Sequence, residues 1–412
     1  MTTVRRDGLG LILPAGVESA EQTLAFGRCA DRLGLGRLWL GQHLTLDPHQ
    51  VHVHLAASGV RTPRGTSVTL TPLRHPLEAA LQARGVAALT GRPFVAGFGA
   101  GAPDFVVAML GRPHSSPLTA MRQYLGAVRN LLDGDNVYWG AGTVALPELE
   151  HPPVEVGAGV LRPAMARVAG EVADCAITWM TPPDYLRDSI VPALQEGTAK
   201  AGRPRRPRVV TVVHVAVERE GRDPHALAFL AARLHLSQPH YAAMLRSAGL
   251  PVDPADPVSG ARALVNFDVF VSGTPVDIAR ELERYHEAGV DEVVLNPCGV
   301  LLAEGTGAAL RDVEEIAAAV ALRQGPTPRG REALHTVVRD HCLAMKGIIV
   351  GLDEDEPDPL PLGFMDPFAG FQLAVHLEEE LDVLLVEHLA TFRGCTTHDL
   401  ADHILAAHPG LA

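Results

Sequence analysis

The stretch PVEVGAGVLRPAMARVAGEVADCAITW, residues 153–179, carries the clearest α/β pattern of the chain. It predicts a strand over Val154–Val156, a glycine turn at Gly157–Val160, a helix that begins near Pro163, and a second strand over Cys175–Trp179. β-Branched residues favour the buried strands of parallel sheets, glycine permits a sharp turn, and proline suits the first turn of a helix. A strand, a helix and a second strand in this order indicate an α/β protein.

The predicted turn at 157–160 leads directly into a helix N-terminus. Free backbone N–H groups and the helix dipole favour a bound anion there, most often a phosphate. The spacing Gly-x-Gly lacks the third glycine of a dinucleotide-binding fingerprint. From these residues alone, a phosphate site and an ordinary loop without a ligand remain alternatives.

Short apolar runs recur along the chain and alternate with helical patterns. We expect strands at Gly8–Leu13, Leu38–Gly41, Ser67–Leu70, Phe94–Phe98, Val154–Val156, Cys175–Trp179, Val209–Val217 and Glu292–Leu295. Eight such units predict a (β/α)8 TIM barrel of the α/β class, and a doubly wound open sheet is the alternative. The segment 224–262 is longer than one crossover needs, so we expect an insertion after the seventh strand.

Composition limits the classes of function. The chain of 412 residues is 47% apolar and 20% charged, as a globular protein is, and its net charge of −13 argues against a nucleic-acid partner. No run of about 18 apolar residues occurs, so we expect no membrane span and a cytoplasmic protein. Five scattered cysteines without a Cys-x-x-Cys pair predict reduced thiols and no metal site.

Five sequence pieces, in order, carry a family resemblance. They are LGLGRLWLGQH (33–43), GTSVTLTPLRHP (65–76), GFGAG (97–101), the run VGAGVLRPAMARVAGEVAD (156–174), and GTP followed by AGVDEVVL within 273–295. Across residues 8–320 the chain resembles the bacterial luciferase-like monooxygenase superfamily. It is most similar to the methylenetetrahydromethanopterin-reductase-like branch, which uses the deazaflavin coenzyme F420.

The resemblance implies a TIM barrel that binds coenzyme F420 or FMN. It implies a cofactor phosphate at the 157–160 backbone, the ribityl chain and ring edge along 99–101, and a non-proline cis peptide at Ser67–Val68 beside the ring. The implied cofactor-binding residues are Ser67, Val68, Thr69, Gly99, Ala100, Gly101, Gly157, Ala158, Gly159 and Val160.

His43 follows the second strand, where deazaflavin-dependent relatives place a histidine near the reactive face of the cofactor. The resemblance implies a catalytic role, because an imidazole can donate a proton to the product of hydride transfer or stabilise developing charge. The alternative is a histidine that only positions the substrate or caps a loop. Many relatives have an acidic residue before this histidine and another after the glycine-rich turn, where this chain has Gln42 and Ala102.

Other histidines have simpler interpretations. His49, His52 and His54 lack a carboxylate motif, so we expect a polar loop and no metal. His235 and His240 lie in the predicted insertion; we expect them at the solvated surface, with substrate contact as the alternative. Trp179 ends the sixth strand, where it would line the pocket or fill the core.

The last residues form a second predicted module. We expect a linker at 325–330 and, over 331–412, helices at Ala333–Val350, Phe368–Leu381, Glu387–Thr391 and Thr397–Ala407. Residues 331–412 contain 15 acidic and 4 basic residues. This acidity and the order of the predicted helices make the module similar to acyl or peptidyl carrier proteins. Carrier proteins need a serine after the aspartate, but Pro367 follows Asp366, and 331–412 contains no serine. A degenerate carrier used for docking, dimer contacts or stability is expected, with an unrelated four-helix domain as the alternative.

Three functions remain as alternatives, the first two implied by the resemblance. The first is an F420- or FMN-dependent oxidoreductase of secondary metabolism, which transfers hydride to or from a small or carrier-bound substrate beside a peptide or polyketide synthase. The second is a reduced-FMN-dependent monooxygenase. The third is a cofactor-free binding or scaffold protein, which the loss of acidic residues at Gln42 and Ala102 keeps open. A homodimer is expected from the family.

Overall fold

A computed structural model describes residues 8–140 and 142–323 throughout. Beyond them it describes 334–335, 338–339, 341–343, 346, 360–363, 369–370, 373–374, 377 and 395–408. The chain divides into two units, Met1–Arg323 and Gln324–Ala412.

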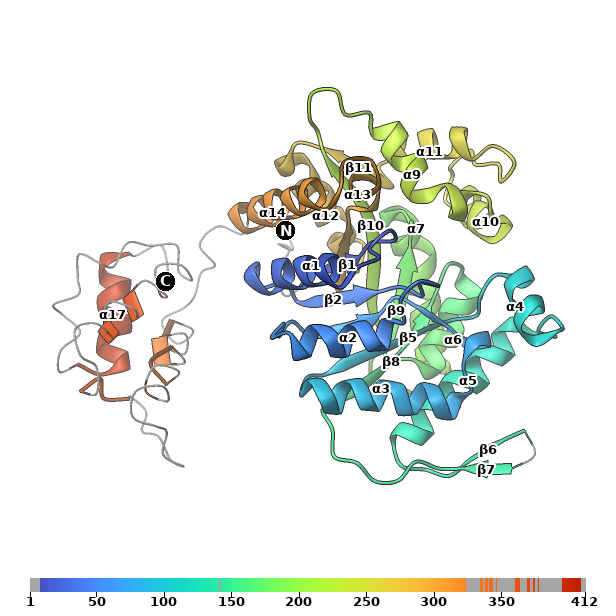
Figure 1. Cartoon of the computed structure of the whole chain (residues 1–412), viewed down its shortest axis with the longest axis horizontal. Helices are drawn as coiled ribbons and strands as arrows, with labels where there is room; N and C mark the ends of the chain where they lie inside the picture. The colour runs from blue at the N-terminus through green and yellow to red at the C-terminus, as the bar shows by residue number, and fades with distance from the viewer. Residues whose placement is uncertain are drawn as a thin grey trace. The chain divides into compact units, whose positions relative to one another are not determined.

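Eight parallel strands form a closed barrel in the first unit (Figure 1). The ring closes because the first strand pairs with the last and the sixth pairs with the seventh. In ring order the strands are β1 (Leu9–Leu13), β2 (Arg37–Leu40), β3 (Arg64–Thr66), β5 (Phe94–Gly99), β8 (Val154–Gly159), β9 (Cys175–Trp179), β10 (Arg208–Val217) and β12 (Glu292–Asn296). The predicted TIM barrel is confirmed, and the open sheet is excluded.

The third strand of the barrel is interrupted. The predicted strand Ser67–Leu70 begins too late: β3 ends at Thr66, and only the short strand β4 (Thr69–Leu70), which pairs with β5, lies within the predicted range. The peptide bond between Ser67 and Val68 is cis, as the resemblance implies.

Helices surround the barrel and complete the β/α units. They are α1 (Ala20–Arg32), α2 (Pro48–Ala57), α3 (Pro76–Thr90), α5 (Pro117–Leu132), α6 (Pro163–Val172), α8 (Val191–Lys200), α12 (Pro275–Glu287) and α14 (Thr306–Arg323). Shorter elements are η2 (Thr71–Leu73), α4 (Pro103–Leu110), α7 (Pro183–Tyr185), η3 (Leu186–Ile190), α13 (Cys298–Glu304) and the antiparallel hairpin β6 (Val137–Trp139) with β7 (Gly142–Val144).

The predicted insertion contains three helices. They are α9 (Pro224–Leu236), α10 (Pro239–Ser247) and α11 (Pro257–Asn266), grouped at one end of the barrel in Figure 1. A further parallel strand, β11 (Phe270–Gly273), follows them and pairs with the C-terminal half of β10. The sequence analysis missed β11, because four residues next to a long helix give little periodic signal.

The histidine-rich segment at 48–57 is a helix, and the predicted polar loop is wrong. Asp47 caps α2 by accepting hydrogen bonds from the backbone of His49 and Gln50, and a proline occupies the first helical position. Both features are standard helix-start signals. His49 and His52 are buried on this helix, whereas His54 is exposed.

The barrel interior is apolar in its middle layer. Alternate strand residues point inward, and they include Ile12, Trp39, Val95, Cys175, Ile177, Val210, Val212 and Val294. The opposite faces of the strands pack against the helices in a larger core. Cys29, Cys175, Cys298 and Cys342 are buried thiols outside any disulfide, as predicted.

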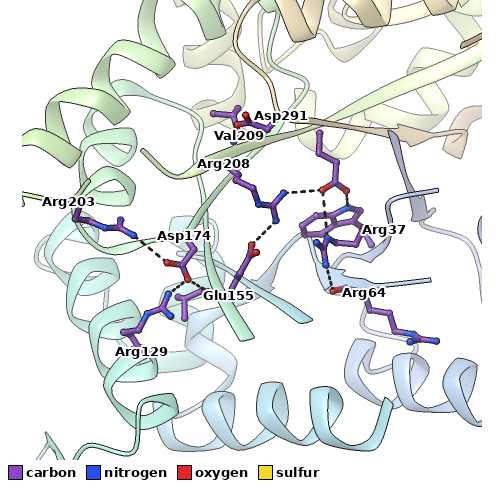
Figure 2. A network of polar contacts seen from close by, with 12 residues as sticks. Arg37, Arg64, Arg129, Glu155, Asp174, Arg203, Arg208, Val209 and Asp291 are labelled. Atoms are coloured by element: carbon purple, nitrogen blue, oxygen red, sulfur yellow. Dashed lines mark hydrogen bonds and ion pairs between the residues drawn. The ribbon is translucent and has the colours of Figure 1, made fainter. Parts of the chain in front are cut away.

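Charged side chains close the N-terminal end of the barrel (Figure 2). Arg208 forms ion pairs with Glu155, at 2.7 Å, and with Glu292, at 3.4 Å. Glu292 also accepts a 2.6 Å hydrogen bond from Nε1 of Trp39 and lies 3.7 Å from Nε of Arg37. This network fixes the N-terminal end of the barrel, called its lower end below. Active sites of TIM barrels lie at the opposite end, where the strands have their C-termini.

Asp174 lies just beyond the C-terminal end of α6 and joins it to neighbouring elements (Figure 2). Its carboxylate accepts a 2.9 Å hydrogen bond from the backbone of Val156 and pairs with Arg129 and Arg203. The helix that follows β8 is therefore fixed at its C-terminal end.

The second unit has an apolar core of its own. Its buried residues are Leu334, Val338, Cys342, Leu360, Leu362, Ala369, Leu373, Ala374, Leu377, Leu400, Ala401 and Ile404. Helix α17 (Thr397–Ala407) coincides with the last predicted helix and begins at a capping box of Thr396 and Asp399. The predicted linker 325–330, the Asp366–Pro367 pair and the helix 387–391 lie outside the described residues, as do parts of the other two predicted helices. The carrier-like assignment stays a prediction. Within the described part of the chain, the helices are too short or too polar to cross a membrane.

Candidate functional site at the C-terminal end of the barrel

The glycines of the opening stretch lie within a strand. β8 extends to Gly159, and Val160 donates its N–H to the carbonyl of Ile177 at 2.8 Å. The sharp turn predicted at 157–160 is therefore wrong. These residues continue the strand, and the chain leaves the sheet only after Val160. Gly157 is needed for close packing, since a Cβ there would lie 3.0 Å from Ile177 and 3.2 Å from Gly97.

The neighbouring strand β5 has the same character. A Cβ on Gly99 would lie 2.7 Å from Cγ2 of Val68, and one on Gly159 would lie 3.6 Å from the same atom. Val68, the residue after the cis peptide, therefore packs against Gly99 and Gly159 on two neighbouring strands. Gly101 has a left-handed backbone, with φ of +80°, and Ala100 is only half-buried. The ends of β5 and β8 therefore form a surface of backbone and small side chains.

The N-terminus of α6 opens beside this surface. Arg162 is the N-cap residue but makes no side-chain capping bond, and Pro163 follows at the first helical position. The side chains of Ala158 and Val160 are buried in the outer core. Only the backbone of this segment, together with the exposed Arg162 guanidinium, can therefore meet a ligand. Arg162 was not predicted, because sequence reasoning placed the turn on the glycines before it.

His43 follows β2 at the same end of the barrel. Burial lowers the pKa of His43 below its ordinary value, and a hydrogen bond with the Leu13 backbone partly opposes this shift. The side chain borders a small cavity of about 10 Å³, lined by Leu13, Val17, Thr23, Leu40, Leu46 and Val51. Because a backbone carbonyl accepts only from an N–H, the second ring nitrogen of neutral His43 carries the lone pair.

A polar network holds the loop of His43. Gln42 donates its backbone N–H to the carbonyl of Val68 at 3.0 Å and its amide N–H to the carbonyl of His43 at 2.9 Å. Its amide oxygen accepts a 2.8 Å hydrogen bond from Arg74, which also pairs with Asp47 at 2.6 Å. Gln42 therefore connects His43 to an arginine, where relatives are expected to have a carboxylate.

Threonines fix the interrupted third strand. Thr66 and Thr69 each donate a hydroxyl hydrogen bond to the carbonyl of Gly97 at 3.1 Å. The buried Oγ of Ser67 has no hydrogen-bond partner among the described residues. The predicted residues 67–69 and 99–101 thus lie together around Val68, with a polar atom available to a ligand.

A chain of aromatic and imidazole rings lies at the ends of β9 and β10. Trp179 contacts His214 at a centroid distance of 5.6 Å and His235 at 5.3 Å. His235 contacts Tyr241 at 5.0 Å, and Tyr241 contacts His240 at 4.8 Å. His235 and His240 are half-buried rather than fully solvated as expected, because the His235 ring packs against Trp179 and the His240 ring against Tyr241.

His214 was missed in the sequence. It sits in a strand so rich in valine that the whole segment was interpreted as core. The alternation of side chains along the strand could have identified it. Val210 and Val212 point into the barrel, so His214, two residues further on, points inward as well. It is 1% exposed and lies at the upper end of the interior.

Comparisons with known proteins agree with this geometry. Residues 6–292 match the family model described as luciferase-like monooxygenase, and a comparison with curated protein sequences gives no match. The chain is similar to the coenzyme F420-dependent tetrahydromethanopterin reductase from Methanopyrus kandleri, with a TM-score of 0.61 and 18% identity over 78% of this chain and 99% of that one.

Two other solved structures show the same fold. An F420-dependent secondary alcohol dehydrogenase in complex with an F420–acetone adduct has a TM-score of 0.57 and 18% identity, over 76% of this chain and 99% of that one. The oxygenating constituent of 3,6-diketocamphane monooxygenase from Pseudomonas putida, in complex with FMN, has a TM-score of 0.58 and 18% identity, over 76% and 98%.

Proposed function

Because the chain belongs to the luciferase-like monooxygenase family, we propose that it is an oxidoreductase that uses coenzyme F420 or FMN and transfers hydride to or from a small substrate. Structural neighbours of the same fold are described as using one or the other cofactor. The proposal depends most on the open N-terminus of α6 beside the glycine ends of β5 and β8.

The residues present fit such a cofactor. A phosphate would meet the backbone after Val160, the N-terminus of α6 and Arg162, where the helix dipole and the guanidinium both favour an anion. The ribityl chain and ring would lie along Gly99–Gly101 and against Val68, and the buried, unpartnered Oγ of Ser67 offers a hydrogen bond. The surface formed by 67–69 and 99–101 has no large side chain that would oppose a flat ring.

His43 would handle the proton. When bound, coenzyme F420 supplies ring carbon C5 as the hydride donor or acceptor. Burial keeps His43 neutral near pH 7, so its ring nitrogen with the lone pair would accept the O–H proton of a substrate alcohol. The alcohol would become a carbonyl compound, with its proton going to His43 and its hydride to the cofactor. Neutral His43 can act as a base, whereas the resemblance implies a proton donor. In the reverse reaction, the reduction of a carbonyl compound, protonated His43 would donate the proton.

Oxygenation by reduced FMN is the second candidate function. The FMN complex of a monooxygenase has the same fold, and the same barrel residues would hold either cofactor. Consumption of oxygen distinguishes the two functions, because a deazaflavin forms no peroxide adduct.

The proposal also includes the partners of the protein. The carrier-like features of 331–412 support a carrier-bound substrate and a peptide or polyketide synthase partner in secondary metabolism. A homodimer follows from family resemblance.

The test is a titration of the full chain with oxidised and reduced FMN and with coenzyme F420, followed by absorbance and fluorescence. Micromolar binding of F420 without FMN supports hydride transfer. Preference for reduced FMN, with oxygen uptake, supports the monooxygenase. Binding of neither overturns both enzymatic functions and leaves a cofactor-free binding or scaffold protein.

A further inference from the structure

The rings at the ends of β9 and β10 form one continuous series. In contact order they are Phe270, His214, Trp179, His235, Tyr241 and His240. They come from β11, β10, β9, α9 and α10, so the insertion is needed to complete the series. We call these six residues the ring series.

The polar atoms of the ring series lack partners. Both ring nitrogens of His214, Nδ1 of His235, Nδ1 of His240 and Nε1 of Trp179 are buried without a hydrogen bond in the described structure. A buried donor or acceptor without a partner costs about 1–3 kcal/mol. Such groups are uncommon in folded proteins, and several in contact indicate a site that a ligand completes.

The ring series lies next to the proposed cofactor surface. Trp179 and Val68 both pack against the same interior cluster of the barrel. Val68 in turn covers Gly99 and Gly159. A molecule that contacts Trp179 and His214 would therefore be close to the ring of a bound cofactor.

The ring series carries no charge at neutral pH. Burial lowers the pKa of His214 to about 3 and that of His235 to about 4, with each neighbouring imidazole adding to the shift. Burial also lowers the pKa of His240, with a contribution from Arg162. A neutral imidazole offers one donor and one acceptor, and the Trp179 indole adds a donor. A hydroxyl or carbonyl group matches these atoms, and a flat aromatic ring matches the surrounding rings, most of which contact one another edge-on or tilted.

We propose that the ring series is the substrate site, and that it takes an uncharged, planar aromatic compound with a hydroxyl or carbonyl group. His214, Trp179 and His235 supply polar contacts through their unpartnered ring nitrogens, and Tyr241 covers the aromatic face. The inference rests on the proposed function, since it assigns the substrate class of that oxidoreductase.

The experiment measures binding of three probes to the full chain, with and without the cofactor that it binds. The probes are 2-naphthol, 2-methylnaphthalene and 2-naphthoate, followed by quenching of tryptophan fluorescence and by calorimetry. We expect 2-naphthol to bind about tenfold more tightly than either other probe, the effect of one satisfied buried hydrogen bond.

Two variants locate the site. His214→Phe and His235→Phe keep a ring but remove its nitrogens, so each should weaken 2-naphthol binding about tenfold and leave 2-methylnaphthalene unchanged. His225→Phe is the matched control on α9, because His225 makes no contact with the ring series, and it should bind 2-naphthol as the parent does. Circular dichroism and cofactor binding confirm that each variant is folded.

The outcomes separate the inference from the proposed function. Equal binding of all three probes by the parent chain, or unchanged 2-naphthol binding by both folded variants, overturns the substrate site even when the cofactor binds. Tighter binding of 2-naphthoate overturns the uncharged substrate class. If no cofactor binds, the proposed oxidoreductase fails, and hydroxyl-selective binding of 2-naphthol then shows a binding site without a substrate role.

Discussion

Arg74 and Asp47 form an ion pair, with 2.6 Å between Nη2 and Oδ2, beside the loop that carries His43. The same Asp47 carboxylate caps α2, and the same guanidinium binds Gln42. His49 and Arg74 hold the pKa of Asp47 well below its usual range. One pair of residues therefore stabilises a helix and orients the backbone next to the candidate catalytic residue.

Asp47→Ala should destabilise the fold. Loss of the cap costs about 1 kcal/mol, and the largely buried Arg74 loses its counter-charge, so we expect a total of about 2–4 kcal/mol in urea denaturation. Asp104→Ala, in the exposed first turn of α4, is the control and should change stability by less than about 0.5 kcal/mol. Since the folded-state pKa is depressed, this stabilisation is present above about pH 4 and is lost as the pH falls. A D47A chain as stable as its parent at pH 7 would contradict this role.

Gly97→Ala tests the close packing of β5 and β8. A Cβ at Gly97 would lie 2.1 Å from the carbonyl oxygen of Thr66, which is backbone and cannot rotate away. We expect a loss of about 3 kcal/mol or more in stability, measured by thermal or urea unfolding. Gly126→Ala, in α5 with nothing within 4 Å of the added Cβ, is the opposite case and should gain about 0.5–1 kcal/mol. Equal effects of the two substitutions would refute the packing argument.

Glu292→Gln tests the charged network at the lower end of the barrel. Glu292 is 3% exposed and serves Trp39, Arg37 and Arg208, so we expect a loss of about 3–5 kcal/mol. Glu155→Gln removes a more exposed partner of the same Arg208 and should cost about 1 kcal/mol or less. Cofactor affinity should not change in either variant, and a change would show that the two ends of the barrel are coupled.

Acid should destabilise the chain through the buried histidines. The folded-state pKa values of His214 and His235 are about 3 and about 4, below the value for unfolded histidine. Only the unfolded chain binds these protons as the pH falls below about 6.5, so stability decreases with decreasing pH. Each histidine should contribute about 2 kcal/mol to the loss between pH 7 and pH 5.

The variant His214→Phe measures how much His214 contributes to this loss of stability. The free energy of unfolding is measured by urea denaturation at pH 7 and pH 5 for the parent and for H214F. The parent should lose more stability than the variant over this interval. Identical pH dependence in the two proteins would show that His214 takes up its proton in the folded state.

The barrel was predictable from sequence because its signals are local. The valine-rich strand that is β10 and the proline-started helices α3, α5 and α6 are visible as runs and periods within a few residues. The cis peptide at Ser67–Val68 was predicted from the family resemblance, because no local sequence pattern specifies it.

The candidate site was harder to predict because long-range packing decides its parts. Gly157 looked like a turn residue, yet its partner is Gly97 on another strand. His235 and His240 looked like surface residues, yet α9 places His235 against Trp179 and α10 places His240 against Tyr241. Helix α2 was missed because three histidines suggested a polar loop and outweighed the Asp47–Pro48 start signal.

The cofactor affinity of Arg162→Ala tests the proposed phosphate site. Because the cofactor phosphate is proposed to bind at the N-terminus of α6, R162A should weaken F420 or FMN binding about tenfold, the effect of one charge-assisted hydrogen bond. Arg167→Ala lies further along the same helix, where Arg167 pairs with Glu196 at 2.6 Å, and should bind as the parent does. Parent-like binding by R162A, or equal weakening by both variants, would contradict the phosphate site at α6.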